Sequence, residues 1–187
     1  AGERYFFDQQ TLSGGSPYWR LIDPSGSQVF AQGVSDVDVL TLTQTGPYTL
    51  LVEGRYAETT PASYSFVVQP VTDDVAALPL NQTVTGAIGT AGQQDRYIFT
   101  LGGPTQLYFD SLSASPNLTW SLSGPTGTVV TPRAFTNSDS ADLYYGTNPV
   151  LILPPGAYTL TVDAYLDATG SYTFRLMDLA TATALTP

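Results

Sequence analysis

The residues of this sequence that are best suited to chemistry are carboxylates. Asp36 and Asp38 flank Val37 and would share one face of a strand, so both could meet a hard cation such as calcium. Asp139 and Asp142 form a second pair in a loop-like stretch. Neither pair has the D-x-[DN]-x-[DN]-G spacing of a calcium loop. We therefore keep calcium as a candidate ion, beside the alternative that these carboxylates are simply solvated.

The composition excludes most other chemistry. The chain of 187 residues has no Lys, no His and no Cys, which removes thiolate and Schiff-base catalysis, disulfides and His or Cys metal sites. Serine and threonine have no histidine base, and the Asp pairs that glycoside hydrolysis would need have no accompanying cleft motif. We therefore predict that the chain is not an enzyme. The net charge of −10, with six scattered Arg, predicts no nucleic-acid partner.

Five aromatic residues are candidates for ligand binding, because internal repetition of the sequence does not account for them. Such side chains can stack on sugar rings or contact a proline-rich fibre such as collagen. The favoured alternative is that they shield a sheet edge or a contact between repeats. They are Tyr56, Phe135, Tyr144, Tyr145 and Tyr165.

The sequence repeats itself at a distance of about 100 to 110 residues. The segment GPYTLLVEG, from Gly46, matches GAYTLTVDA, from Gly156. YWRLIDPSG around Trp19 likewise matches TWSLSGPTG around Trp120, and SYSFVV matches SYTFRL. A repeat of this length is too long for a solenoid unit, so each copy should be a domain.

Both copies show the alternation of half-buried antiparallel strands, for example at Tyr158–Val162. Turn residues separate these stretches, and the second copy has about eight strands against six in the first. We therefore predict an all-β chain of tandem antiparallel, jelly-roll-like β-sandwich domains, over residues 1–78 and 79–187. The first copy lacks the opening strands of the second, and we expect the chain to be part of a longer array.

The repeated aromatic residues should be structural. Trp19 and Trp120 are expected at the centre of each sandwich. Tyr48 and Tyr158 each follow a glycine by two positions at a strand start. A tyrosine there can bury its ring and bond a nearby backbone group, as in the tyrosine corner of other sandwiches.

Four motifs in order resemble the bacterial pre-peptidase C-terminal domain family. They are GQQDRYIF from Gly92, GPTG from Gly124, PGAYTL from Pro155 and GSYTF from Gly170. The resemblance covers about residues 81–178, and its later part recurs over 1–70. It implies a secreted, non-catalytic jelly-roll domain attached to proteases or collagenases, or strung in large surface proteins, and some members bind calcium or collagen.

At Asp95 the family has its opening aspartate, which is either a calcium ligand or, as we favour, a cap on the turn before the next strand.

These patterns favour a repeat module of a large secreted or cell-surface bacterial protein that acts as a spacer or adhesive stalk beside adjacent copies of itself. One alternative is a carbohydrate- or collagen-binding accessory module of a secreted hydrolase, with a glycan or matrix protein as partner. Another is a strand-donating subunit of an extracellular assembly, because the first copy would expose unpaired strand edges. No apolar stretch is long enough for membrane insertion, and no signal peptide is visible.

Overall fold

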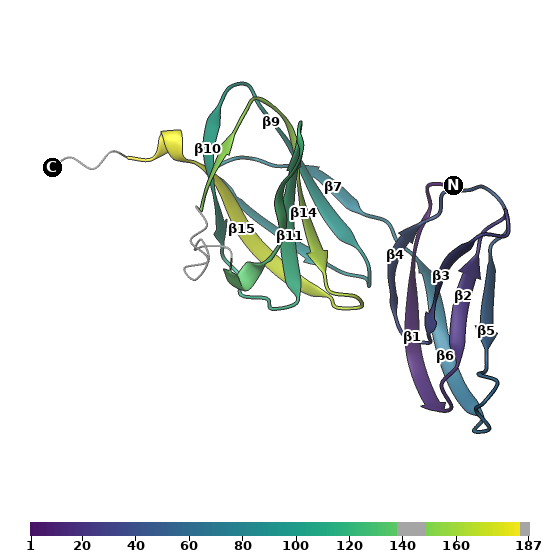
Figure 1. The fold of residues 1–187 in the computed structure, drawn as a ribbon. Helices are drawn as coiled ribbons and strands as arrows, with labels where there is room; N and C mark the ends of the chain where they lie inside the picture. Colours follow the sequence, from purple (N-terminus) through teal and green to yellow (C-terminus); the bar gives the residue numbers. More distant parts are fainter. Residues whose placement is uncertain (138–148, 184–187) are drawn as a thin grey trace. The chain divides into compact units, whose positions relative to one another are not determined.

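The computed structural model describes residues 1–137 and 149–183, which fold almost entirely into β-strands (Figure 1). The all-β prediction of antiparallel sheets packed as sandwiches is confirmed. The chain divides into two compact units, Ala1–Thr72 and Asp73–Pro187. The division falls before β7 (Asp74–Ala77), whereas the sequence placed it after residue 78. The reason is that β7 pairs with β9 (Gln94–Leu101), in parallel, and so belongs to the second unit.

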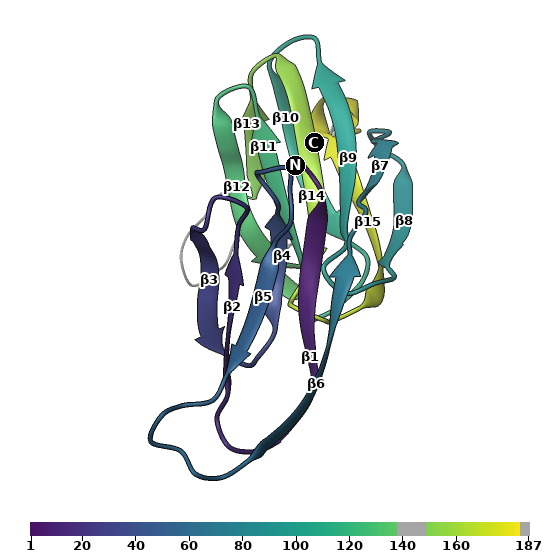
Figure 2. The ribbon, with the colours of Figure 1, turned by 90° about the vertical axis from the view of Figure 1, so that its right-hand side faces the viewer.

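The first unit consists of two three-stranded antiparallel sheets, with strand orders β4-β1-β6 and β3-β2-β5. Figures 1 and 2 show β2 between β3 and β5 in the second of these sheets. Its strands are β1 (Arg4–Gly14), β2 (Tyr18–Ile22), β3 (Gln28–Gly33), β4 (Val37–Thr41), β5 (Thr49–Glu53) and β6 (Ala62–Pro70).

Alternation along β2 explains how this unit forms its core. Trp19 and Leu21 are buried, while the residues between and beside them are only half-buried. A tight turn follows, in which Asp23 Oδ1 accepts hydrogen bonds from the backbone N–H of Ser25 and Ser27. Gly26 supplies the positive φ of this turn, +86°. The turn leads directly into β3 and so fixes the β2–β3 hairpin.

The second unit has a four-stranded sheet, β13-β10-β15-β8, and a five-stranded sheet, β12-β11-β14-β9-β7. The strands not yet bounded are β8 (Thr83–Ile88), β10 (Thr105–Ser111), β11 (Leu118–Gly124), β12 (Gly127–Ala134), β13 (Val150–Leu153), β14 (Gly156–Ala164) and β15 (Gly170–Asp178). In the described residues the helical segments are two short 3-10 turns, Phe135–Asn137 and Leu179–Thr181. No helix among those residues has the length and apolar character that crossing a membrane would require.

Stacked aromatic rings fill the space between the two sheets of the second unit. Phe109 of β10 stacks on Trp120 of β11, with ring centroids 3.9 Å apart, and on Phe174 of β15 at 5.1 Å. Trp120 is 1% exposed, as the sequence predicted for a residue at the sandwich centre. In the first unit, Trp19 is fully buried and meets the edges of neighbouring rings instead.

The strand orders of the two units coincide. If β1 to β6 are matched in sequence with β10 to β15, the sheet β4-β1-β6 corresponds to β13-β10-β15, and β3-β2-β5 corresponds to β12-β11-β14. The second unit has three strands more. In it, β8 pairs with β15, β9 pairs with β14, and β7 pairs with β9.

The two strand-start tyrosines make the same hydrogen bond. The Tyr158 hydroxyl donates to the backbone oxygen of Pro154 at 2.7 Å, four residues earlier. The Tyr48 hydroxyl donates to the backbone oxygen of Gln44 at 3.2 Å, also four residues earlier. Each hydroxyl therefore fixes the loop that leads into its own strand, as the sequence predicted.

Replacing Tyr158 with Phe should lower the free energy of unfolding of the second unit by about 1 kcal/mol, because the Pro154 oxygen loses its donor. The chain has two tryptophans, one per unit, so 19F-labelled tryptophan followed during urea unfolding reports each unit separately. Tyr165→Phe is the matched control, because Tyr165 is 72% exposed. Equal losses in the two variants would contradict a role for the hydroxyl bond.

Candidate functional site

A polar cluster inside the second unit joins its two sheets. The Tyr172 hydroxyl, on β15, donates to Oδ2 of Asp95, on β9. Gln93 Nε2 donates to Asp95 Oδ1 at 2.9 Å. The hydroxyls of Tyr97 and Tyr172 lie 2.7 Å apart, and since Tyr172 gives its hydrogen to Asp95, Tyr97 is the donor in this pair. Asp95 is 4% exposed and Tyr172 is 1% exposed, so this chain of bonds is shielded from water.

Gln93 connects the cluster to the turn that precedes β9. Its Oε1 accepts hydrogen bonds from the backbone N–H of Gly89 at 2.9 Å and of Thr90 at 3.2 Å. Its Nε2 also donates to Asp74 Oδ2 at 3.2 Å. The sequence assigned the turn-capping role to Asp95, but the structure gives that role to Gln93, whose longer side chain reaches the turn. Asp95 is instead the acceptor that joins the sheets.

Burial controls the protonation of this cluster. It raises the pKa of Asp95, an effect that the hydrogen bonds from Tyr172 and Gln93 oppose and the nearby charges of Asp74 and Asp73 reinforce. Burial also raises the pKa of Tyr97. For Tyr172, burial and then the hydrogen bond to Asp95 raise the pKa far above its ordinary value, which agrees with its hydroxyl acting as the donor to Asp95.

Glycine is required where β8 passes the cluster. A Cβ added at Gly86 would meet the Tyr172 hydroxyl, and it would lie 2.8 Å from the Tyr97 hydroxyl. Real Cβ atoms essentially never come so close to another heavy atom. The backbone of β8 therefore covers the two hydroxyls directly, which closes the cluster on that side.

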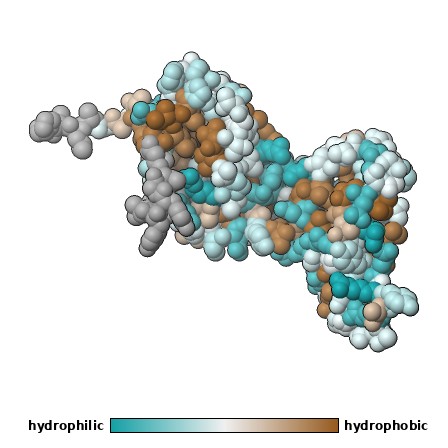
Figure 3. Space-filling view, viewed as in Figure 1, coloured by the Kyte–Doolittle hydropathy of each residue, from teal (hydrophilic) through white to brown (hydrophobic). Residues whose placement is uncertain are grey.

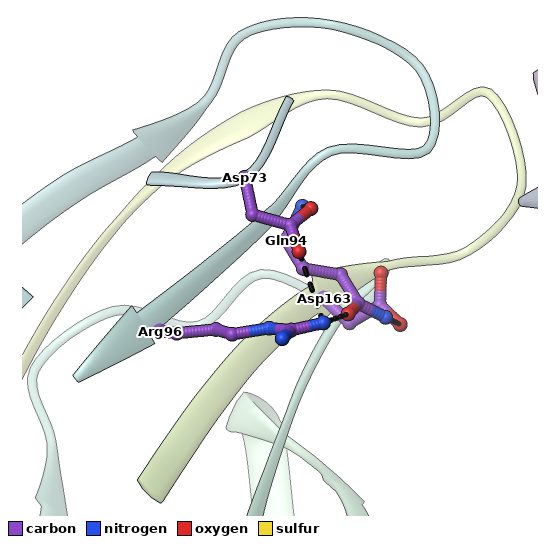
Figure 4. A network of polar contacts seen from close by, with 4 residues as sticks. All are labelled: Asp73, Gln94, Arg96 and Asp163. Atoms are coloured by element: carbon purple, nitrogen blue, oxygen red, sulfur yellow. Dashed lines mark hydrogen bonds and ion pairs between the residues drawn. The ribbon is translucent and has the colours of Figure 1, made fainter. Parts of the chain in front are cut away.

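A second, more exposed network lies where β7, β9 and β14 meet (Figure 4). Arg96 pairs with Asp73 Oδ2 at 3.0 Å and donates to Gln94 Oε1 at 3.3 Å. Gln94 Nε2 donates in turn to Asp163 Oδ2 at 2.8 Å. The guanidinium is partly exposed, so we expect these contacts to fix the register of β7 rather than to add much stability.

These networks hold strands together. Both oxygens of the Asp95 carboxylate are occupied by donors. In the ranges 1–137 and 149–183, no three His, Cys, Asp or Glu side chains come together in a way that could hold a metal ion.

Each acidic candidate that the structure describes accepts a hydrogen bond within the protein. Asp36 Oδ1 accepts the backbone N–H of Gln9 at 2.8 Å, and Asp38 Oδ1 accepts the N–H of Val39 at 2.7 Å. Asp95 belongs to the buried cluster. The pair Asp139 and Asp142 lies outside the described residues.

The aromatic candidates differ in their exposure to solvent. Phe135 is 2% exposed and packs against Phe109 at 5.8 Å, so it is a core residue and its assignment as a ligand residue is withdrawn. Its position in a 3-10 turn across the end of the core explains why strand periodicity did not reveal it. Tyr56 is fully exposed and Tyr165 is 72% exposed. Tyr144 and Tyr145 lie outside the described residues.

An apolar groove of about 320 Å³ opens in the first unit, and sequence reasoning did not identify it. Figure 3 shows apolar surface at the end of this unit where β1 and β5 begin. The only signal in the sequence was that the first copy lacks its opening strands. The groove is lined by Glu3, Tyr5, Phe7, Leu21, Leu42, Gly46, Tyr48, Leu50 and Val68.

No family model and no curated protein matches the chain. Among solved structures, the pre-peptidase C-terminal domain of collagenase from Bacillus anthracis is similar over 58% of this chain and 97% of its own length, with 18% identity and a TM-score of 0.38. A structure of the infectious bursal disease virus Gx strain is similar over 94% of this chain and 53% of its own, with 14% identity and a TM-score of 0.16. At these identities the likenesses concern the fold alone.

Asp95→Asn should change how stability depends on pH. The folded-state pKa of Asp95 is above its ordinary value of 3.8, so the folded protein binds the proton more tightly, and stability falls as pH rises from 3.8 through the raised pKa. The stability of Asp95→Asn relative to the unsubstituted protein should therefore increase over that window. Urea unfolding of the second unit at several pH values measures it.

Asp23→Asn is the control, because its effect on stability should depend on pH in the opposite direction. Hydrogen bonds, that of the Ser25 side chain first, lower the pKa of Asp23. Asp23 therefore stabilises the folded state above pH 3.8, and that contribution disappears as pH falls through the lowered pKa. A difference between Asp95→Asn and the unsubstituted protein that stays constant with pH would refute the assignment for Asp95.

Proposed function

We propose that this chain is a pair of non-catalytic β-sandwich modules from a secreted or cell-surface bacterial protein, and that it acts as a spacer or adhesive stalk. The supporting observation is the shared strand order of β1 to β6 and β10 to β15. Equivalent tryptophans are buried in β2 and β11, and equivalent tyrosines hold the loops before β5 and β14. A module used repeatedly along one chain is the simplest source of such agreement.

The side-chain chemistry supports a non-catalytic role. The chain has no Lys, His or Cys, and among the described residues the most deeply buried carboxylate, that of Asp95, is held by two donors inside the core. The bacterial and extracellular parts of the proposal rest on the four motifs that resemble the pre-peptidase C-terminal family. Adjacent copies of the same module are the partners we propose.

If the chain is a load-bearing spacer, each of its two units should unfold separately under force. Single-molecule pulling tests this. We expect two unfolding steps, with released lengths of about 25 nm and about 40 nm for units of 72 and 115 residues at about 3.5 Å per residue. Tyr158→Phe should weaken the longer step alone, which identifies it as the second unit. Extension without resolvable steps would argue against a load-bearing spacer.

Exposed tyrosines support one alternative, a carbohydrate- or collagen-binding accessory module. Tyr56 and Tyr165 present free rings, which suits stacking on a sugar or a proline-rich chain. Under the spacer proposal, the protein should bind neither glycan nor collagen arrays. Binding that is lost in Tyr56→Ala, Tyr165→Ala or a Tyr144→Ala/Tyr145→Ala double variant would establish the alternative.

Millimolar calcium should leave the melting temperature of the first unit unchanged, because one carboxylate oxygen of Asp36 and one of Asp38 already accept backbone hydrogen bonds. An ion that binds only the folded state must raise the midpoint. Differential scanning calorimetry with and without calcium measures this, with magnesium as the control for ionic strength. A calcium-specific rise that is lost in Asp36→Asn/Asp38→Asn would establish a calcium site in the first unit.

A further inference from the structure

β7 is a weakly held strand at the edge of the second unit. It ends the five-stranded sheet, and in the described part of the chain its one partner is β9, in a parallel pairing of four residues. All four residues of β7 are exposed, so the strand adds no buried side chain to the core. Parallel pairing is slightly less stable per residue than antiparallel pairing. Segments with few buried apolar contacts open locally at a small cost in free energy, so we expect β7 to open while the rest of the unit stays folded.

The two ends of β7 are held differently. Beyond its last residue, Leu78 is 6% exposed and lies in the core, and its backbone N–H donates to the oxygen of Ile98 at 2.9 Å. Before its first residue the contacts are polar (Figure 4). There Asp73 pairs with Arg96 at 3.0 Å and accepts the backbone N–H of Gln94 at 3.3 Å. Opening should therefore begin at Asp73 and stop at Leu78.

Two carboxylates meet where β7 docks. Asp74 lies directly opposite Asp95 in the register of β7 and β9. Gln93 Nε2 donates to both of them, to Asp95 Oδ1 at 2.9 Å and to Asp74 Oδ2 at 3.2 Å. One amide nitrogen is therefore shared between two acidic groups. Like charges directly opposite each other on neighbouring strands are destabilising, so docking of β7 is less favourable when Asp95 is ionised than when it is protonated.

The other charged and titratable groups around Asp95 are already engaged. The Arg96 guanidinium pairs with Asp73, and Asp163 accepts a hydrogen bond from Gln94. The tyrosine hydroxyls of the buried cluster act as donors. By strand, these groups are Arg96 and Tyr97 of β9, Tyr172 of β15, Asp163 of β14, and Asp73 beside β7, while β8 contributes Gly86, which has no side chain.

We propose that residues 73–77 form an acid-tightened latch, whose docking on β9 is coupled to the protonation of Asp95. A proton on Asp95 removes its repulsion with Asp74 and favours docking. By reciprocity, docked β7 favours the proton on Asp95. The pKa of Asp95 agrees with this coupling, because burial raises it most and the charges of Asp74 and Asp73 raise it further. The added docking stability is therefore present in acid and is lost as pH rises through the raised pKa of Asp95.

The latch adjusts the length of the chain between the two units. It follows Thr72, the last residue of the first unit. Opening frees residues 73–77 as extra connector, up to about 17 Å at about 3.5 Å per residue. The connector is therefore shorter in acid and longer at neutral pH. This inference is independent of the spacer role, because opening of β7 is measured without load.

Hydrogen exchange of the full chain, with rates divided by the intrinsic rate at each pH, tests the proposal. Protection of residues 73–78 should fall at least about fivefold between about pH 4 and about pH 7, the lower end of ordinary coupling between sites. β12 is the internal control, because it forms the opposite edge of the same sheet.

Two variants assign the effect to the opposed carboxylates. Asp74→Asn and Asp95→Asn should each make the protection of residues 73–78 nearly constant over this pH range. Asp74 is exposed, so its variant keeps the test decisive if Asp95→Asn impairs folding. Asp110→Asn is the matched control, because Asp110 pairs with Arg175 in the other sheet, and it should keep the full pH dependence.

Three outcomes would overturn the proposal. In one, β7 exchanges only together with the core of the second unit, so that it does not open by itself. In another, its protection in the unsubstituted protein does not change with pH. In the third, the pH dependence persists in both Asp74→Asn and Asp95→Asn, which would assign it to other groups.

Discussion

Each unit depends on closing the space between two sheets with aromatic rings. Alternation along the strands directs one row of side chains inward, and the row of one sheet must meet the row of the other. In the second unit Phe109, Trp120 and Phe174 form a continuous stack, and all three rings are buried. In the first unit the corresponding tryptophan is equally buried, but many apolar residues packed around it remain half-exposed. The same arrangement is thus closed in one unit and open in the other.

The buried polar cluster is the second constraint, and it depends on the first. A carboxylate inside a sandwich is costly unless donors saturate it. Asp95 receives donors from Gln93 on its own side and from Tyr172 on the opposite sheet. Such a cluster requires β9 and β15 to be present together, and it therefore specifies the pairing of the two sheets as well as contributing to their stability. The absence of any side chain at Gly86 allows β8 to complete this enclosure.

Much of the fold could be predicted from the sequence, because antiparallel strands with one buried face leave a two-residue pattern. That pattern located Trp19 and Trp120, and the glycine two positions before Tyr48 and Tyr158 indicated their loop-fixing hydroxyl bonds. The pattern fails where burial does not follow strand alternation. Phe135 lies in a 3-10 turn outside the strands. All four residues of β7 are exposed, and this strand pairs in parallel, so neither element shows the periodicity.

The roles of Asp95 and of the groove were harder to predict for a different reason. A carboxylate beside a turn suggests a local cap, because sequence spacing reveals neighbours along the chain but not a tyrosine 77 residues away. The groove was harder still to predict, since its lining comes from β1, β2, β5 and β6 and from the loops beside them, which are far apart in the sequence. It becomes visible only when the two units are compared position by position. Tyr64 is 41% exposed and the matching Tyr172 is 1% exposed, because Tyr172 is covered by Tyr97 of β9 and by Phe135.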